Sequence, residues 1–293
     1  MNLEDLKTAY EHCELCPRRC GADRRSRKGF CGAGTEIRAA KAMLHPWEEP
    51  AVGIPAGTVF FSGCTLGCLY CQNYRISHEG FGKTLSPEEL ARVFLDLQDK
   101  GAKNIDLVTP THYLPGILTA LDLCGDRLQL PIVYNCGGYE RKEVIEMLED
   151  TVDIWLPDIK YYSNETARKY SGAGDYFEVA VTAVQEMLRQ VKGKESKKLI
   201  LRHMVLPGQK EDSIRLLREL AERIGTEGYL LSLMSQYTPF YKAHEHPEID
   251  RRVTSYEYGK VLDEAVRLGF DGFMQERTSA KEEYTPSFDL EGL

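Results

Sequence analysis

The chain has 293 residues, a hydrophobic content of 42%, a charged content of 28% and a formal net charge of −8. These values are typical of a globular protein with a substantial core, and the acidic balance argues against nucleic acid or an anionic membrane as a partner. No apolar run reaches the length of a membrane span, and the acidic N-terminus lacks the apolar core of a secretory signal. We therefore expect a cytoplasmic protein, in which the nine cysteines are metal ligands or redox groups rather than disulfides.

Composition divides the chain into two parts. Residues 1–56 are rich in cysteine, arginine and glycine, and we interpret them as a metal-binding extension in which the basic run at residues 24–28 lies in a solvated loop. Residues 57–63 are apolar and bounded by glycine, which predicts a short buried strand. Ser86, Pro87 and Glu89 form a helix-start signal, and Gly101 is expected to end that helix.

Apolar runs of strand length then alternate with runs of helical periodicity. Such alternation predicts a parallel sheet with helical crossovers, arranged either as an open doubly wound sheet or as a barrel-like curl. The expected strands are residues 104–109, 131–136, 152–157, 199–206 and 229–235, with one more within 269–274; the expected helices are residues 114–123, 140–149, a stretch within 163–191, 212–224 and 255–268.

Polar residues follow four of the expected strands. They occupy residues 109–112 (TPTH), 135–138 (NCGG), 158–160 (DIK) and 207–208 (PG). In both layouts ligands bind at the C-terminal ends of the strands, so we expect the functional site there.

The loop after the first strand contains Cys64, Cys68 and Cys71 within eight positions. A structural zinc site needs four protein ligands, whereas three thiolates can hold three irons of a [4Fe–4S] cluster and leave the fourth iron free for an exchangeable ligand. Gly63 and Gly67 allow the backbone to curl closely around such a cluster. The alternative is a redox-active or incidental set of thiols.

The spacing Cys64-x3-Cys68-x2-Cys71, with Tyr70 before the last cysteine, resembles the signature of the radical S-adenosylmethionine (SAM) enzymes. The resemblance implies an α/β fold, a partial (β/α)6 barrel of the radical SAM type over residues 57–293, with the N-terminal cysteine-rich extension of residues 1–56 before it. The resemblance implies that S-adenosylmethionine binds the free iron. An electron from the cluster would then cleave S-adenosylmethionine to a 5′-deoxyadenosyl radical, and this radical would take a hydrogen atom from a substrate. A reductant such as flavodoxin or ferredoxin is implied as a partner.

From Cys13 to the C-terminus, the chain resembles the stand-alone branch that is similar to pyruvate formate-lyase activating enzymes. Asp158-Ile159-Lys160 matches the Asp-Leu-Lys motif of that branch, and residues 202–208 (RHMVLPG) resemble its strand that ends in Val-Pro-Gly. The resemblance implies that Asp158 and Lys160 contact the amino acid and ribose of S-adenosylmethionine and that Arg202 binds its carboxylate. A purely structural ion pair is the alternative for Asp158 and Lys160.

The chain departs from the branch at other strand ends. Residues 109–112 replace a Gly-Gly-Glu-like stretch, so Thr109 and His112 are the candidates there to contact the cofactor, with a structural loop histidine as the alternative for His112. Asn135 begins the replacement of an Asp-Thr-Asn-Gly stretch and is a candidate to hydrogen-bond the ribose or methionine group. Its neighbour Cys136 is either a hydrogen donor or, as we favour, a small buried thiol.

Four further cysteines, Cys13, Cys16, Cys20 and Cys31, lie in the extension. Four thiolates on short loops can close a tetrahedral site, and both zinc and a second iron–sulfur cluster fit that count. We favour a structural zinc, because the first two cysteines form a knuckle outside the barrel. A cluster would instead relay electrons, and unligated thiols are the third option. Cys124 follows a helical pattern and is expected in the core.

Three functions remain open from the sequence. The first is hydrogen abstraction from a glycine of a glycyl radical enzyme, and the second is a radical reaction on another peptide or on a small molecule. The third is a non-catalytic iron–sulfur or zinc protein for electron transfer or binding. That third function has no need of the set formed by Asp158, Lys160 and Arg202. The sequence does not name the substrate.

Overall fold

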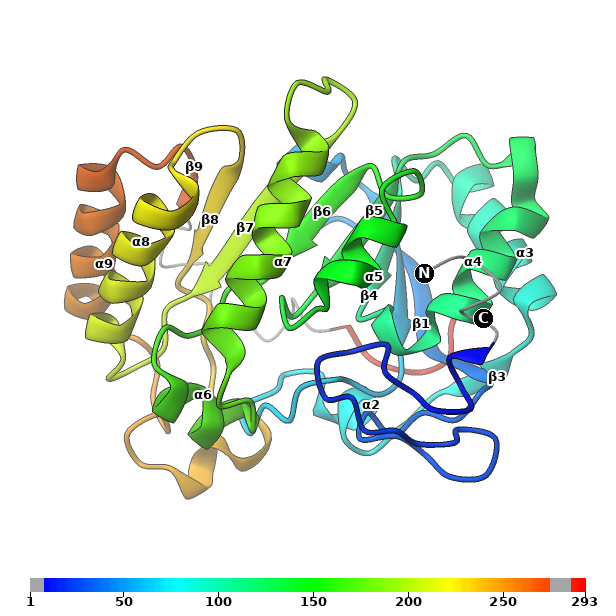
Figure 1. Ribbon diagram of the computed structural model, residues 1–293, viewed down its shortest axis with the longest axis horizontal. Helices are drawn as coiled ribbons and strands as arrows, with labels where there is room; N and C mark the ends of the chain where they lie inside the picture. The colour runs from blue at the N-terminus through cyan, green and yellow to red at the C-terminus, as the bar shows by residue number, and fades with distance from the viewer. Residues whose placement is uncertain (1–7, 275–285) are drawn as a thin grey trace. The chain divides into compact units, whose positions relative to one another are not determined.

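The computed structural model describes residues 8–274 and 286–293 (Figure 1). The first seven residues, on which part of the argument against a secretory signal rests, lie outside the described residues. The described residues belong to two compact units: the first is drawn from Met1–Thr65, Arg75–Trp155 and Ser287–Leu293, and the second from Leu66–Tyr74 and Leu156–Pro286. Within the described part, no helix has both the length and the apolarity that crossing a bilayer requires.

The first unit contains a sheet with the strand order β3-β1-β2-β4-β5. Its strands are β1 (Ile37–His45), β2 (Ala56–Phe61), β3 (Lys83–Leu85), β4 (Ile105–Val108) and β5 (Ile132–Cys136). β2, β4 and β5 are parallel, whereas β1 pairs antiparallel with both β2 and β3. β1 lies inside the predicted extension and pairs with β2, the first predicted strand, within the first unit.

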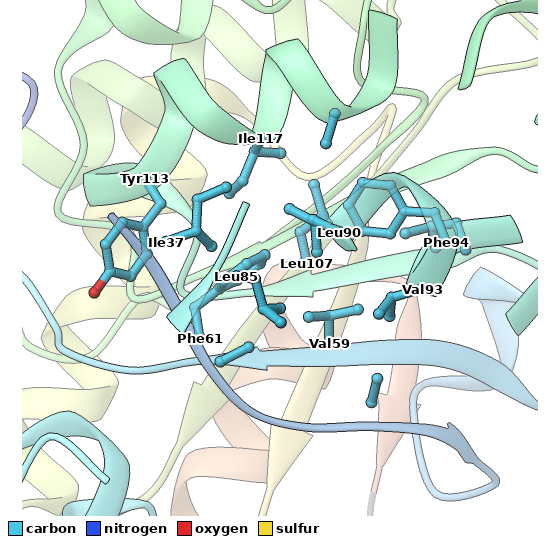
Figure 2. Packing of buried hydrophobic residues seen from close by; sticks show 14 of the residues in the cluster. Ile37, Val59, Phe61, Leu85, Leu90, Val93, Phe94, Leu107, Tyr113 and Ile117 are labelled. Carbon is cyan, nitrogen blue, oxygen red and sulfur yellow. The ribbon is translucent and has the colours of Figure 1, made fainter. Parts of the chain in front are cut away.

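The core of the first unit lies between this sheet and two helices, α3 (Pro87–Asp99) and α4 (Leu114–Cys124). Figure 2 shows Leu90 and Phe94 of α3 beside Val59 of β2 and Leu107 of β4. The sequence places a buried residue on each turn of α3, and Ser86 and Glu89 form the predicted capping box. Cys124 is buried in α4, as predicted. The shorter elements are η1 (Pro50–Val52), α2 (Tyr74–Ser77), η2 (Thr111–Tyr113), η3 (Gly125–Arg127) and α5 (Lys142–Met147).

The chain passes from the first unit to the second within β6 (Ile154–Pro157). The second unit contains the parallel strands β7 (Lys198–Met204), β8 (Leu230–Met234) and β9 (Gly272–Met274). Its helices are α6 (Asn164–Ser171), α7 (Tyr176–Val191), η4 (Tyr241–Glu245), α8 (Lys210–Ile224) and α9 (Ser255–Leu268). The expected strands and helices are therefore present, and the stretch within 163–191 forms two helices because Gly172 adopts the left-handed conformation that ends α6.

The expectation of a solvated loop at residues 24–28 is wrong for one residue, Arg24. The basic run at residues 24–28 is exposed at four of its five positions, but Arg24 is 2% exposed. Its guanidinium is buried because three backbone carbonyls and an aromatic ring surround it.

Candidate functional site

The beginning of the cysteine loop is fixed in the first unit. Cys64 follows β2, and its backbone N–H donates to the carbonyl of Cys31 at 3.2 Å. Gly63 has a φ of 91°, and a Cβ there would lie 2.5 Å from the same carbonyl oxygen. Glycine is therefore required at this position for the two cysteine-bearing segments to approach each other.

The rest of the loop belongs to the second unit and is held by α6. The N–H groups of Gly67 and Leu69 donate to the carbonyls of Ser171 and Tyr170 at 3.1 and 2.9 Å. The thiol of Cys68 is buried, and its sulfur lies 2.9 Å from the Ser171 hydroxyl oxygen. Cys71 is half-buried, and its N–H donates to the carbonyl of Cys68 at 3.3 Å.

Tyr70 is part of a buried chain of hydroxyl groups that ends at Cys68. Its hydroxyl lies 2.5 Å from that of Tyr161, which lies 2.7 Å from the Ser171 hydroxyl. Burial raises the pKa values of both tyrosines well above 10, so both hydroxyls are neutral. Sequence reasoning missed Tyr161 and Ser171, although Tyr161 directly follows the Asp158-Ile159-Lys160 motif.

Asp158 forms ion pairs with two cations in the second unit. One carboxylate oxygen lies 2.6 Å from the Lys160 ammonium, and the other lies 2.9 Å from Nε of Arg202. Only 20%, 17% and 14% of the side chains of Asp158, Lys160 and Arg202 are exposed. The predicted pairing of Asp158 with Lys160 is thus observed, with Arg202 as a further partner.

The electrostatics of this set keep all three groups charged. Burial raises the pKa of Asp158, but Lys160 and Arg202 outweigh it and hold the pKa below its ordinary value. Burial lowers the pKa of Lys160, but Asp158 and Cys68 outweigh it and raise the pKa to about 12. One carboxylate therefore pairs with both cations at this strand end.

His203 fixes the backbone between Asp158 and Lys160. Its Nδ1 donates to the carbonyl of Ile159 at 2.6 Å, because a carbonyl only accepts, and its Nε2 lies 2.9 Å from the Ser213 hydroxyl. Burial lowers the pKa of His203 to about 4, so the ring is neutral. The N–H of Ile159 also donates to the carbonyl of Arg202 at 2.7 Å, which ties the two segments of the site together.

The predicted residues of the first unit lie at the ends of β4 and β5. Thr109 has a φ of 59°, which is strained for a β-branched residue and is typical of functional sites. Its N–H donates to the carbonyl of Asn135 at 2.8 Å. The side-chain amide of Asn135 donates to Glu48 at 3.1 Å and to Asp106 at 3.5 Å, two carboxylates that sequence reasoning missed. The charge of Asp106 within the apolar run of β4 was the available signal.

His112 supports the cysteine loop rather than pointing to solvent. The ring is 2% exposed, and its Nε2 donates to the carbonyl of Ser62 at 2.8 Å, two residues before Cys64. Burial lowers the pKa of His112 to about 4, so the imidazole is neutral. These contacts favour a positioning role for His112, in line with the alternative of a structural loop histidine that the sequence left open.

A buried acid lies near the same strand ends. Glu140 is 2% exposed and accepts a hydrogen bond from Thr111 at 2.9 Å, and Thr111 accepts one from Tyr134 at 3.0 Å. Burial raises the pKa of Glu140 to about 8, so the carboxyl group is mostly protonated at neutral pH. Cys136 is buried beside this group, in agreement with the favoured interpretation of a small buried thiol.

The predicted site residues are divided between the two units. Cys64, Thr109, His112 and Asn135 belong to the first, and Cys68, Tyr70, Cys71, Asp158, Lys160 and Arg202 belong to the second. Cys13, Cys16 and Cys31 are buried and Cys20 is half-buried in the first unit. Among residues 8–274 and 286–293, no group of three or more His, Cys, Asp or Glu side chains stands in a metal-binding arrangement, so the ligand roles of both cysteine sets stay predictions.

The loop residues nevertheless fit a thiolate-bound cluster chemically. Cys64, Cys68 and Cys71 form no disulfide bonds within the part of the chain that the structure describes, and soft thiolates are the ligands that iron–sulfur clusters take. Cys68 has a hydroxyl within hydrogen-bond distance of its sulfur, and the Lys160 ammonium interacts electrostatically with that thiol. A hydrogen-bond donor and a cation both stabilise a thiolate.

Comparison with known proteins assigns the chain to a family. Residues 58–221 match the model of the radical SAM superfamily. Uncharacterized protein MJ0674 of Methanocaldococcus jannaschii is 30% identical over 280 residues, which are 92% of this chain and 79% of the relative. The pyruvate formate-lyase-activating enzyme of Clostridium pasteurianum is 25% identical over 238 residues, which are 74% of this chain and 89% of that enzyme.

Solved structures agree on the fold. A radical SAM methyltransferase from Sphaerobacter thermophilus matches with a TM-score of 0.54 and 13% identity, over 93% of this chain and 85% of that chain. Streptococcus suis SuiB bound to its precursor peptide SuiA matches with a TM-score of 0.51 and 13% identity, over 73% of this chain; this chain spans 46% of that one. The fold is the α/β partial barrel of these proteins, and the chain belongs to the radical SAM superfamily.

Proposed function

We propose that this protein abstracts hydrogen from a polypeptide, with a glycine of a glycyl radical enzyme as its target. Membership of the superfamily implies a [4Fe–4S] cluster and S-adenosylmethionine. When bound, these two groups supply the reductive cleavage of S-adenosylmethionine, and the 5′-deoxyadenosyl product accepts the hydrogen atom from the polypeptide. The roles of the chain's own residues follow from their contacts.

The observation that supports S-adenosylmethionine binding most directly is the charge of the Asp158 set. Two cations face one carboxylate, and each side chain is at least four-fifths buried. Both cations are largely buried and already oriented by one carboxylate, so they are placed to bind a further anion that enters the site. The carboxylate of S-adenosylmethionine supplies that anion, and the planar guanidinium of Arg202 suits a carboxylate. Asp158 then orients both cations, and His203 fixes the backbone that presents them.

The remaining predicted residues take complementary roles. Cys64, Cys68 and Cys71 ligate the cluster, and Ser171 donates a hydrogen bond to the sulfur of Cys68, with Tyr161 and Tyr70 fixing its direction. Thr109 and Asn135 contact the amino acid or ribose part of S-adenosylmethionine. His112 holds Ser62 and thereby the start of the cysteine loop.

The similarity to an activating enzyme supports the choice of a polypeptide target. The alignment with the pyruvate formate-lyase-activating enzyme spans 89% of that enzyme, so it extends beyond the shared cofactor-binding core.

Purified pyruvate formate-lyase is the probe for this proposal. The anaerobically reconstituted protein, with S-adenosylmethionine and reduced flavodoxin, should produce a glycyl radical that electron paramagnetic resonance detects. With deuterated glycine in the lyase, deuterium should appear in 5′-deoxyadenosine. The Cys64→Ala variant is the control and should give neither signal. Release of 5′-deoxyadenosine without radical or deuterium transfer would reject the glycyl target while leaving the radical SAM chemistry intact.

A further inference from the structure

Arg24 is a buried cation in the N-terminal segment. Its Nη1 donates to the carbonyl of His112 at 2.6 Å, its Nε to that of Ala33 at 3.3 Å, and its Nη2 to that of Gly34. The guanidinium carbon lies 4.3 Å from the centre of the Tyr10 ring. These contacts fix the guanidinium firmly, but all of them are with neutral groups.

None of the ion pairs formed by the described residues joins Arg24 to a carboxylate. The neighbouring acids Asp23 and Glu11 pair instead with the exposed Arg25, at 2.9 and 2.7 Å. A buried charge without an opposite charge is strongly disfavoured, so the surroundings of Arg24 require an anion. The groups around Arg24 that can become anionic include the thiols of the N-terminal cysteines.

Three of the four N-terminal cysteines, Cys13, Cys20 and Cys31, interact with this arginine, and Cys16 interacts with Cys13 and Cys31. The sulfur of Cys13 lies 3.9 Å from its Nη1. Cys13 pairs with Ala22 through its own N–H at 3.0 Å and accepts from Gly21 at 3.1 Å, and Arg19 turns back onto the carbonyl of Cys16 at 3.0 Å, so short turns fold the segment. A Cβ at Gly29 would lie 3.4 Å from the sulfur of Cys20 and 3.5 Å from that of Cys31. The missing side chain of Gly29 thus leaves space between two of the thiols.

We propose that Cys13, Cys16, Cys20 and Cys31 bind a second metal centre through four thiolates, with Arg24 as its buried counter-charge. A zinc ion with four thiolates and a [4Fe–4S] cluster with four thiolates both bear a net charge of about −2. Either centre therefore provides the anion that Arg24 lacks. Zinc in a structural role is the occupant we favour, because the segment is tightly folded by short turns.

This second centre adjoins the start of the cysteine loop. Cys31 accepts the backbone hydrogen bond of Cys64, and the carbonyl of His112 accepts from Arg24 while its ring donates to Ser62. A zinc centre would thus stabilise the segment that presents Cys64.

Metal analysis of a variant that lacks the loop cysteines tests the centre without any dependence on the radical reaction. In the Cys64→Ala/Cys68→Ala/Cys71→Ala protein, we expect about one zinc per chain, and iron with sulfide would identify the cluster instead. Adding Cys16→Ser should remove the metal, whereas adding Cys124→Ser, which alters a buried cysteine of α4, should not. Absence of metal from the triple variant, or its retention after Cys16→Ser, would overturn the proposal.

The role of Arg24 has a separate test with matched variants. Competition with a chelator should show that Arg24→Gln binds the metal about 10- to 100-fold more weakly, the usual cost of removing a group next to the ligands. Arg24→Lys, which retains the charge, should lose less, and Arg25→Gln should bind like the parent. Circular dichroism verifies that each variant is folded. If Arg24→Gln does not fold, Arg24→Lys provides the comparison. Equal affinity in the parent and a folded Arg24 variant without the charge would reject the counter-charge role.

Discussion

The carboxylate of Asp158 determines how two cations are presented at one strand end, and its removal and that of Arg202 have different consequences. Arg202→Ala should lose a charge-assisted bond to S-adenosylmethionine worth about 1.5–3 kcal/mol, which is about tenfold or more in affinity. Asp158→Ala should do more damage, because it leaves Lys160 and Arg202 as buried like charges without their partner.

Calorimetric titration with S-adenosylmethionine, together with iron content, measures both effects. The cluster should remain in both variants, because neither change removes a thiolate. Arg218→Ala is the control, since Arg218 is exposed and pairs with Glu264 in the same unit. If both site variants bind S-adenosylmethionine like the parent, the pocket lies elsewhere.

His203 gives a second residue-level prediction, a dependence of stability on pH. Its pKa is about 4 in the folded protein and about 6.5 when unfolded, so the unfolded chain binds the proton first as the pH falls. The stabilising contribution of the neutral ring is complete above pH 6.5 and is lost as the pH falls toward 4, by up to about 1.4 kcal/mol per pH unit.

Denaturant unfolding at pH 7.5 and pH 5 tests this contribution. His203→Gln should lower the free energy of unfolding at pH 7.5 and make it less sensitive to acid than in the parent. An unchanged slope in His203→Gln would contradict the account of a neutral buried ring.

Some of these residues could be predicted from the sequence and others could not. Asp158 and Lys160 were predictable as a pair because strand alternation places residues two apart on one face. The burial of Arg24 was not predictable, because Arg24 begins a polar and basic run whose other members are exposed. Nothing in the run distinguishes the buried residue from the exposed ones. Tyr161 and Ser171 were missed because a hydroxyl chain depends on tertiary packing, which periodicity does not encode.

At the scale of elements, the parallel strands were predictable and the antiparallel pair was not. β2, β4 and β5 are apolar runs bounded by turn residues. β1 contains Lys41, whose ammonium is buried and pairs with Asp289 and Glu291 at 3.1 and 3.0 Å. Because Lys41 is neutralised by acids near the other end of the chain, its charge interrupts the apolar pattern that would mark a buried strand. β1 was therefore not predicted from the sequence.

The capping box of α3 yields an element-level prediction. The Ser86 hydroxyl accepts from the N–H of Glu89 at 3.2 Å, and the Glu89 carboxylate accepts from the N–H of Ser86 at 2.8 Å. Ser86→Ala should lower the free energy of unfolding by about 1 kcal/mol, because it leaves a helix-end N–H without its acceptor. Ser86→Asp should stay close to the parent, since aspartate also caps well. Denaturant unfolding checks both, and no loss in Ser86→Ala would show that water replaces the cap.

For the whole molecule, the alternation of strands and helices restricted the fold to two layouts, and the similarity to radical SAM structures identified the partial barrel. Hydrophobic periodicity could not choose between the layouts because it reports burial rather than the curvature of a sheet, whereas the resemblance at the cysteine loop already implied the partial barrel. The cysteine spacing indicated the family because it specifies a chemistry, in which three thiolates bind three of the four irons of a cluster and leave the fourth iron free. The target of the radical depends on surfaces that no short spacing encodes.

The central claim is that Cys64, Cys68 and Cys71 hold the cluster that cleaves S-adenosylmethionine, and its most direct test is the release of 5′-deoxyadenosine. The reconstituted parent should bind about four irons at this site. When reduced under anaerobic conditions it should release 5′-deoxyadenosine, and so should the Cys124→Ala control. Alanine at any one of the three loop cysteines should abolish the release. Retained turnover in any of these three variants would contradict the account.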